Sequence, residues 1–302
     1  MTTHTTCSWG IRRLGEAFKL VFDPTKWGVR MLELEKNGIL PALISYTVPY
    51  ADILTDTDGW DWIKIALRSF HVHFPGEKVL VVDNDMEDER YAGKRAWLHA
   101  HPDAIVIRNP ATRDFRFWKD HNPRDNHHHG TGIDLAVAYC RRQGYAFLLY
   151  FEPDCLVCGT VWVDNMWEGM ERGAWVAGPN TASHSDRIIH PCPSIWRIDS
   201  SCCRTTFLRQ SKGVDRQHPL YPALTGFDDV AMNWDAWDTA QKNWWVAALQ
   251  GKAFRSHFPH REFIHYWNGS GFLGKRSVRA QRDYWMFEPY LQDSVTGGGR
   301  SS

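Results

Sequence analysis

Two carboxylates follow directly after an apolar segment near the middle of the chain. Residues 145–159 read YAFLLYFEPDCLVCG, which places Glu152 and Asp154 just after seven apolar or aromatic residues. An unpaired carboxylate in an apolar interior is costly, so both acids are expected past the end of a strand, where a positive group meets them. Two carboxylates one residue apart can hold Mg2+ or Mn2+, and such a cation neutralises a substrate diphosphate.

Polar residues also come at the ends of two earlier apolar segments, ILPALISYTV and KVLVVDND. Thr47 and Pro49 lie at the end of the first segment, and Asp83 and Asp85 lie at the end of the second. In isolation, an ordinary turn is the better explanation of Asp83 and Asp85, because Asp and Asn favour turns. Three such strand ends together favour a binding site.

Short apolar segments alternate with helical patterns over residues 39–180. The predicted strands are 39–48, 78–85, 104–110, 145–151 and 174–180. The predicted helices are 60–74, 87–100, 133–142 and 161–172. This alternation predicts an α/β fold with a doubly wound, parallel sheet. Ligands bind at the carboxyl ends of the strands in such sheets, so the polar strand ends are expected to converge there.

The pattern is less regular outside this region. Residues 1–38 are expected to form an amphipathic helical extension packed on the main domain, with contact to a membrane surface as the alternative. Residues 181–290 are expected to complete the same domain and bind an acceptor. They include a candidate strand at 194–201, a Trp-rich helix at 227–249 and then an aromatic, His-containing loop. The tail, 291–302, is expected to be disordered.

Composition excludes several classes of protein. The 302 residues contain 35 Lys and Arg against 35 Asp and Glu, so no net charge favours a nucleic acid as partner. No apolar run is long enough for a transmembrane helix and no secretory signal is visible, which predicts a cytoplasmic protein. The seven cysteines are expected to be reduced. Cys155 and Cys158 form a lone CxxC pair, which favours buried thiols over a zinc site.

Four motifs occur in an order that resembles family 2 glycosyltransferases of the GT-A fold. They are VVDND, HHGTGID, LLYFEPDCLV and HPCPSIWRID, and the match covers residues 39–200. The resemblance implies a single mixed, mostly parallel sheet flanked by helices, with the nucleotide sugar bound by residues 39–180. It departs from the family where Glu152 replaces the first Asp of the Asp-x-Asp motif.

The resemblance also assigns roles to residues. Asp154 would hold the metal and the donor diphosphate, while Glu152 would face the sugar or the ribose. His265 would contact the phosphate or the metal, although a histidine in an aromatic loop is the alternative. The residues expected to bind the donor are Thr47, Pro49, Asp83, Asp85, His129, Gly130, Asp134, Glu152 and Asp154. The residues expected to hold the metal are Asp154, Glu152 and His265.

The HHHG run at residues 127–130 is expected to be a loop. In it, His129 and Gly130 would position the amino end of a helix near the donor phosphates. Consecutive residues cannot easily aim three imidazoles at one ion, which disfavours a zinc site. Asp134 is expected to face the same pocket.

By the same resemblance, an acid at the start of the 227–249 helix would deprotonate the acceptor. Asp229 is the first candidate for this base and Asp228 the second. An ordinary acidic helix start explains both residues equally well. Trp234 and Trp267 are expected to offer flat faces to an acceptor sugar.

The resemblance therefore implies an inverting glycosyltransferase with a UDP- or GDP-sugar donor, a glycan or small-molecule acceptor, and Mn2+ or Mg2+ as cofactor. Two alternatives stay open: a non-catalytic carbohydrate- or nucleotide-binding protein on the same scaffold, and a nucleotidyltransferase. A nicotinamide-dependent enzyme is excluded, because SYTVPYAD replaces the required glycine-rich turn after the first strand.

Overall fold

The computed structural model describes only part of the chain. The described residues are 33–45, 60–83, 92–109, 127–179, 192–204, 207, 240–256, 262–265, 286 and 290. The chain divides into two compact units, Met1–Glu33 and Leu34–Ser302, and every element below belongs to the second. Of the expected amino-terminal extension, the described part is 33–38, which contains a short 3-10 helix, η2 (Glu35–Asn37). The expected tail, 291–302, lies outside the described residues.

A seven-stranded sheet forms the centre of this unit, in the order β3-β2-β1-β4-β7-β6-β8. Its strands are β1 (Ile39–Ser45), β2 (Val79–Asp83), β3 (Ala104–Arg108), β4 (Phe147–Phe151), β6 (Val176–Pro179), β7 (Ser194–Arg197) and β8 (Ala253–Ser256). The strands from β3 to β4 pair in parallel, as do β6 and β8. Strand β7 runs antiparallel to both of its neighbours. The prediction of a mixed, mostly parallel sheet is confirmed.

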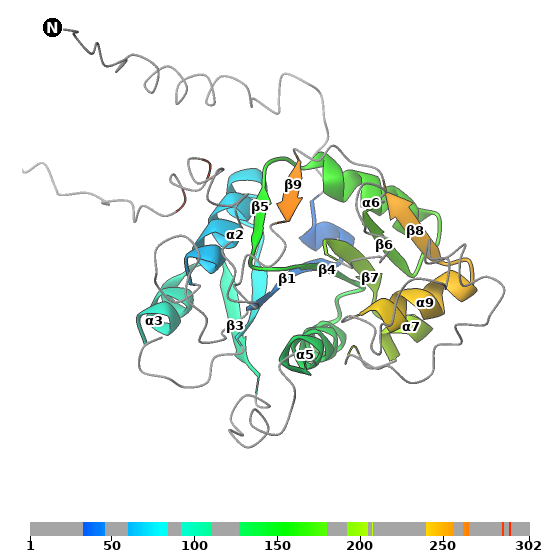
Figure 1. Cartoon of the computed structure of the whole chain (residues 1–302), viewed down its shortest axis with the longest axis horizontal. Helices are drawn as coiled ribbons and strands as arrows, with labels where there is room; N and C mark the ends of the chain where they lie inside the picture. The colour runs from blue at the N-terminus through cyan, green and yellow to red at the C-terminus, as the bar shows by residue number, and fades with distance from the viewer. Residues whose placement is uncertain are drawn as a thin grey trace, which may run out of the picture. The chain divides into compact units, whose positions relative to one another are not determined.

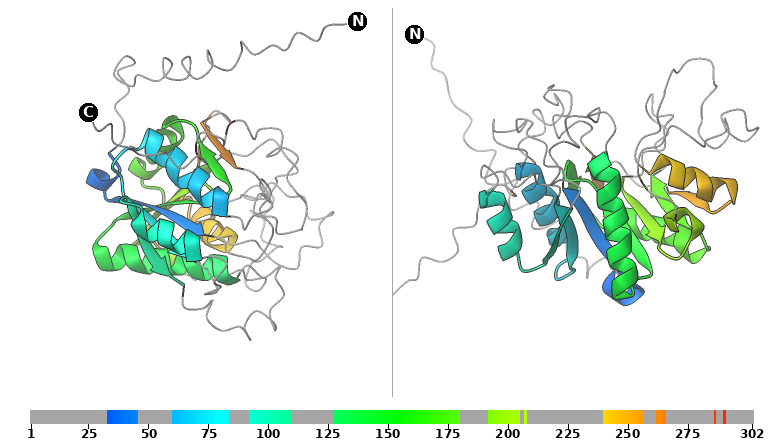
Figure 2. Two further views of the ribbon diagram at one scale, coloured as in Figure 1. Left: turned by 90° about the vertical axis from the view of Figure 1, so that its left-hand side faces the viewer. Right: turned by 90° about the horizontal axis from the view of Figure 1, so that it is seen from below.

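Helices cover both faces of the sheet (Figures 1 and 2). They are α2 (Trp60–His73), α3 (Ala92–Ala100), α5 (His127–Gln143), α6 (Val161–Glu171), α7 (Ser201–Arg204) and α9 (Gln241–Leu249). Successive side chains of a strand point to opposite faces. Accordingly Phe151 of β4 stacks on Phe70 of α2 at 5.4 Å, whereas Tyr150 contacts His129 of α5. The arrangement is an α/β fold, with helices packed on both faces of a mixed, mostly parallel sheet.

A second, smaller sheet pairs β5 (Cys155–Val157) with β9 (Phe263–His265) in antiparallel orientation. Its core is formed by Trp62, Ile65, Leu156 and Ile264, with Cys158, Met286 and Tyr290 packed against them. The expected loop after residue 249 is therefore wrong at β8 and β9. Strands this short carry too few residues for an apolar alternation, and β5 and β9 lie about a hundred residues apart in sequence.

Two predicted helices have different bounds. The helix expected at 133–142 begins at His127, because His129 takes the buried position four residues before Ile133. The continuous helix expected at 227–249 is wrong: α9 begins at Gln241, and Ala240 before it has φ of 66°, a left-handed conformation that a right-handed helix does not contain. Residues 227–239 lie outside the described part.

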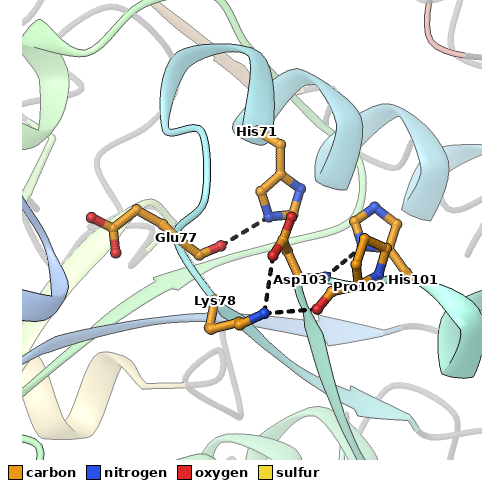
Figure 3. A network of polar contacts seen from close by, with 6 residues as sticks. All are labelled: His71, Glu77, Lys78, His101, Pro102 and Asp103. Carbon is orange, nitrogen blue, oxygen red and sulfur yellow. Dashed lines mark hydrogen bonds and ion pairs between the residues drawn. The ribbon is translucent and has the colours of Figure 1, made fainter.

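The edge of the sheet at which β2 and β3 begin has its own polar network, which Figure 3 shows. Lys78 donates to the carbonyl oxygen of Pro102 at 2.8 Å and to Asp103 Oδ1 at 3.0 Å, which joins the starts of β2 and β3. The rings of His71 and His101 stack with centroids 5.1 Å apart. Burial lowers the pKa of both imidazoles. This network lies at the edge opposite to the carboxyl strand ends.

Within the described residues, no helix is both long and apolar enough to cross a membrane.

Candidate functional site

The register of the parallel strands brings four carboxyl ends to one edge. Asp83, the last residue of β2, is level with Ser45 on β1 and with Arg108 on β3. On the other side of β1, Phe151 is level with Leu43, so Glu152 follows one residue later. Neighbouring strands lie about 4.8 Å apart, so the backbones at Asp83 and Glu152 are separated by about 10 Å. Asp83 is only 4% exposed.

Glu152 and Asp154 lie in the turn between β4 and β5, as expected of acids just past a strand. Glu152 is 8% exposed and Asp154 is 5% exposed. Acidic residues are seldom buried to this extent unless they are paired or bound to a metal. The turn thus concentrates negative charge at the carboxyl edge of the sheet, beside its central strands.

Three buried side chains form a hydrogen-bonded group at this edge. The Tyr150 hydroxyl donates to Glu152 Oε1 at 2.7 Å. Its oxygen also bonds His129 Nε2, which lies 3.5 Å from the same carboxylate oxygen. The group joins the end of β4 to the first turn of α5. Tyr150 was not among the predicted site residues; its position two residues before Glu152, where side chains of an extended chain share a face, is the signal that could have found it.

The first turn of α5 contains the residues expected to form a loop. His129 and Gly130 are both buried and both belong to the helix, so the expected loop is wrong. The two residues do lie at the amino end of the helix, as expected. One turn later, Asp134 Oδ1 accepts a hydrogen bond from the backbone N–H of Phe207 at 2.9 Å. Asp134 therefore anchors the buried Phe207.

His265 is the last residue of β9, and its backbone is level with Cys155. It is therefore brought next to Asp154, although the two residues are far apart in sequence. The description of His265 is limited to its backbone.

Glu262 attaches the small sheet to α6. Its backbone carbonyl accepts from the Cys158 N–H at 2.8 Å, and its carboxylate accepts from the Val161 N–H at 3.2 Å. Burial, and next the charge of Glu262, raise the pKa of Asp164 on the first turn of α6 to about 6. The carboxylate of Glu262 thus satisfies a donor at the amino end of α6 and fixes the start of β9.

The side chains at this turn supply only part of the ligands that a hard cation needs. Among the described residues, no group of three or more His, Cys, Asp or Glu side chains could hold a metal ion. Two carboxylates are nevertheless a usual protein contribution to a Mg2+ site, since water and substrate phosphates complete the coordination. Glu152 and Asp154 fit that pattern.

The described cysteines do not offer thiolate ligands at this site. All six are free. Cys155 and Cys192 lie in contact, with sulfur atoms 3.6 Å apart. Burial raises the pKa of Cys155 to about 11, so this residue is a thiol near neutral pH. The prediction that the cysteines are mostly buried is confirmed.

Several predicted site residues lie outside the described part of the chain. They are Thr47, Pro49, Asp85, Asp228, Asp229, Trp234 and Trp267. Two other tryptophans of the predicted Trp-rich helix, Trp244 and Trp245, are buried on α9. Those two belong to the core.

Comparison with known proteins leaves the family of this chain unassigned. No protein-family model matches it, and no curated protein does. Among solved structures, it is similar to 4-diphosphocytidyl-2C-methyl-D-erythritol synthase, with a TM-score of 0.40 and 12% sequence identity. The match covers 83% of this chain and 97% of the other.

Proposed function

We propose that this protein is a glycosyltransferase that moves a sugar from a nucleotide-diphosphate donor to an acceptor hydroxyl. The observation that carries the proposal is the pair of buried carboxylates, Glu152 and Asp154, directly after β4. The pair lies at the carboxyl edge of an open, mostly parallel sheet, which is where such sheets bind ligands.

Charge supports a phosphate-bearing ligand with a cation at this turn. Two buried carboxylates cannot themselves attract a diphosphate, but Mn2+ or Mg2+ between the carboxylates and the phosphates satisfies both charges. When bound, such a cation would offset the charge that develops on the leaving diphosphate. Asp154 and Glu152 are the residues that would hold it, with His265 as the further expected contact.

The remaining roles belong to the chain's own residues. Asp83, which ends β2, is proposed to contact the base or ribose of the nucleotide. The amino end of α5, with His129 and Gly130 in its first turn, favours negative charge because its backbone N–H groups lack helical partners. Asp229, or else Asp228, is proposed to take the proton of the acceptor hydroxyl, which then attacks the anomeric carbon.

The decisive experiment is calorimetric binding of UDP and of GDP, each with and without Mn2+. The variants are Asp154→Asn and, as a matched control, Asp103→Asn. Asp103 is an acid at the opposite edge of the sheet, paired with Lys78 at 3.0 Å. We expect one nucleotide to bind the wild type more tightly with Mn2+, and Asp154→Asn to weaken that binding by at least about 10-fold. Asp103→Asn should bind like the wild type.

The result against the proposal is equally definite. If the folded wild type binds neither UDP nor GDP with Mn2+, the proposed transfer from a uridine- or guanosine-diphosphate sugar is refuted. If it binds nucleoside triphosphates and transfers a nucleotidyl group, the chain is a nucleotidyltransferase. If it binds a nucleotide sugar with Mn2+ but yields no product with any acceptor or water, it is a binding protein.

A further inference from the structure

Tyr150 lies between two residues that the proposed function uses. Its side chain is fully buried, with Glu152 Oε1 at 2.7 Å and His129 Nε2 in hydrogen-bonding contact. The His129 and Tyr150 ring centroids are 5.7 Å apart. The three residues come from the end of β4, the turn after it, and the first turn of α5.

The direction of the hydrogen bonds follows from the chemistry of the groups. An ionised carboxylate only accepts, so the single hydroxyl proton of Tyr150 goes to Glu152. The Tyr150 oxygen must then accept from His129, which requires a proton on Nε2. The order is His129 Nε2–H to Tyr150 Oη–H to Glu152 Oε1.

Tyr150 differs from the phenylalanines of β4 in its buried hydroxyl group. The neighbouring apolar positions of β4, Phe147 and Phe151, carry a phenyl ring without a polar group. A phenyl ring at position 150 would fill nearly the same volume, while a buried hydroxyl is costly unless it is hydrogen-bonded. At Tyr150 the hydroxyl is directed at a carboxylate that the proposed function requires.

We propose that Tyr150 is a positioning residue for the donor site. Its hydroxyl holds the Glu152 carboxylate and the His129 imidazole in one arrangement, and thereby orients the Glu152-Pro153-Asp154 turn toward a cation-bound diphosphate. This inference rests on the proposed function. Groups that orient ligand carboxylates and imidazoles in this way typically change metal affinity by about 10- to 100-fold when they are removed.

The test compares Tyr150→Phe with Ser200→Ala. Ser200 also carries a buried hydroxyl that donates a hydrogen bond, to the carbonyl oxygen of Arg197. It lies near the other end of β4, because Arg197 is level with Phe147. The two variants therefore each lose one buried hydroxyl, at opposite edges of the sheet. We expect Tyr150→Phe to weaken Mn2+-dependent nucleotide binding by about 10- to 100-fold, and Ser200→Ala to leave it unchanged.

A second measurement needs neither metal nor nucleotide. Protein labelled with 15N-histidine, with the His129 signals assigned from a His129→Gln variant, reports by NMR which ring nitrogen carries a proton. We expect Nε2 of His129 to be protonated in the wild type and its signal to move in Tyr150→Phe, but not in Ser200→Ala. Thermal unfolding of each variant shows whether it is folded.

The outcomes separate the two proposals. A wild type that binds no nucleotide refutes the proposed function, and the role of Tyr150 with it. A wild type and a folded Tyr150→Phe that bind the same nucleotide equally refute the role of Tyr150 alone. A His129 ring without a proton on Nε2 in the wild type also refutes that role, and this result does not depend on whether Tyr150→Phe folds.

Discussion

Replacing either of two helical glycines with alanine should change the free energy of unfolding, in opposite directions at the two positions. Gly169 lies on α6 where the helix packs against β8, and a methyl group there would come within 2.3 Å of Phe254 Cδ1 and Cγ and 2.7 Å of Phe254 Cβ. Gly93 lies near the start of α3, and a methyl group there would meet nothing within 4 Å. The same substitution therefore tests packing at one site and helix propensity at the other.

The expected magnitudes follow from these contacts. Alanine is better than glycine in a helix interior by about 1 kcal/mol, and less near an end, so Gly93→Ala should stabilise by about 0.5 kcal/mol. At Gly169 the same gain is opposed by overpacking, which costs about 1 to 3 kcal/mol. Rotating the Phe254 side chain cannot remove the contact with its Cβ, so the upper end applies. We expect a net loss of about 2 kcal/mol for Gly169→Ala.

The assay is urea unfolding followed by tryptophan fluorescence. The slope of the unfolding free energy against urea concentration is compared between variants, because a shift in the midpoint at constant slope reports a change in stability. A Gly169→Ala variant as stable as the wild type, or more stable, would refute the close packing of α6 on β8. As a check on the cause, the cost of Gly169→Ala should fall in a Phe254→Ala background, because the two nearest ring atoms are then absent.

Two further predictions concern the scaffold. Burial and the charge of Glu262 raise the pKa of Asp164 to about 6, above its pKa in the unfolded chain. Ionisation of Asp164 therefore destabilises the folded state most above about pH 6, and the effect disappears below the pKa of the unfolded chain. Asp164→Asn should therefore stabilise at pH 7.5 by about 1 kcal/mol, after allowance for solvent screening of this half-buried group. Urea unfolding should show the gain shrink as pH falls through 6 toward 4, and a gain independent of pH would contradict the assignment. Phe70 is fully buried and stacks on Phe74 at 4.7 Å and on Phe151 at 5.4 Å. Phe70→Ala should cost about 3 to 5 kcal/mol in the same assay, and a loss below about 1 kcal/mol would show that the site is not packed as described.

The sequence alone predicted the parts of this fold that depend on local patterns. Strands β1, β2, β3, β4 and β6, and helices α2 and α6, lie where alternating apolar segments predicted them. These elements bury apolar side chains at regular spacing, and the spacing can be read without knowing what they pack against. The positions of Glu152 and Asp154 just past β4 follow from the same reasoning, because a strand interior does not accommodate adjacent acids.

Tertiary structure decided what depends on residues distant in sequence. Strand β9 exists because it pairs with β5, and its three residues carry no pattern of their own. The first turn of α5 was missed because His129 faces the core, where its imidazole bonds Tyr150, and a histidine does not count as apolar in a periodicity. The contact among His129, Tyr150 and Glu152 likewise depends on how α5 packs against β4. Local composition sets which segments become strands and helices, whereas hydrogen-bond geometry between segments sets which polar side chains meet.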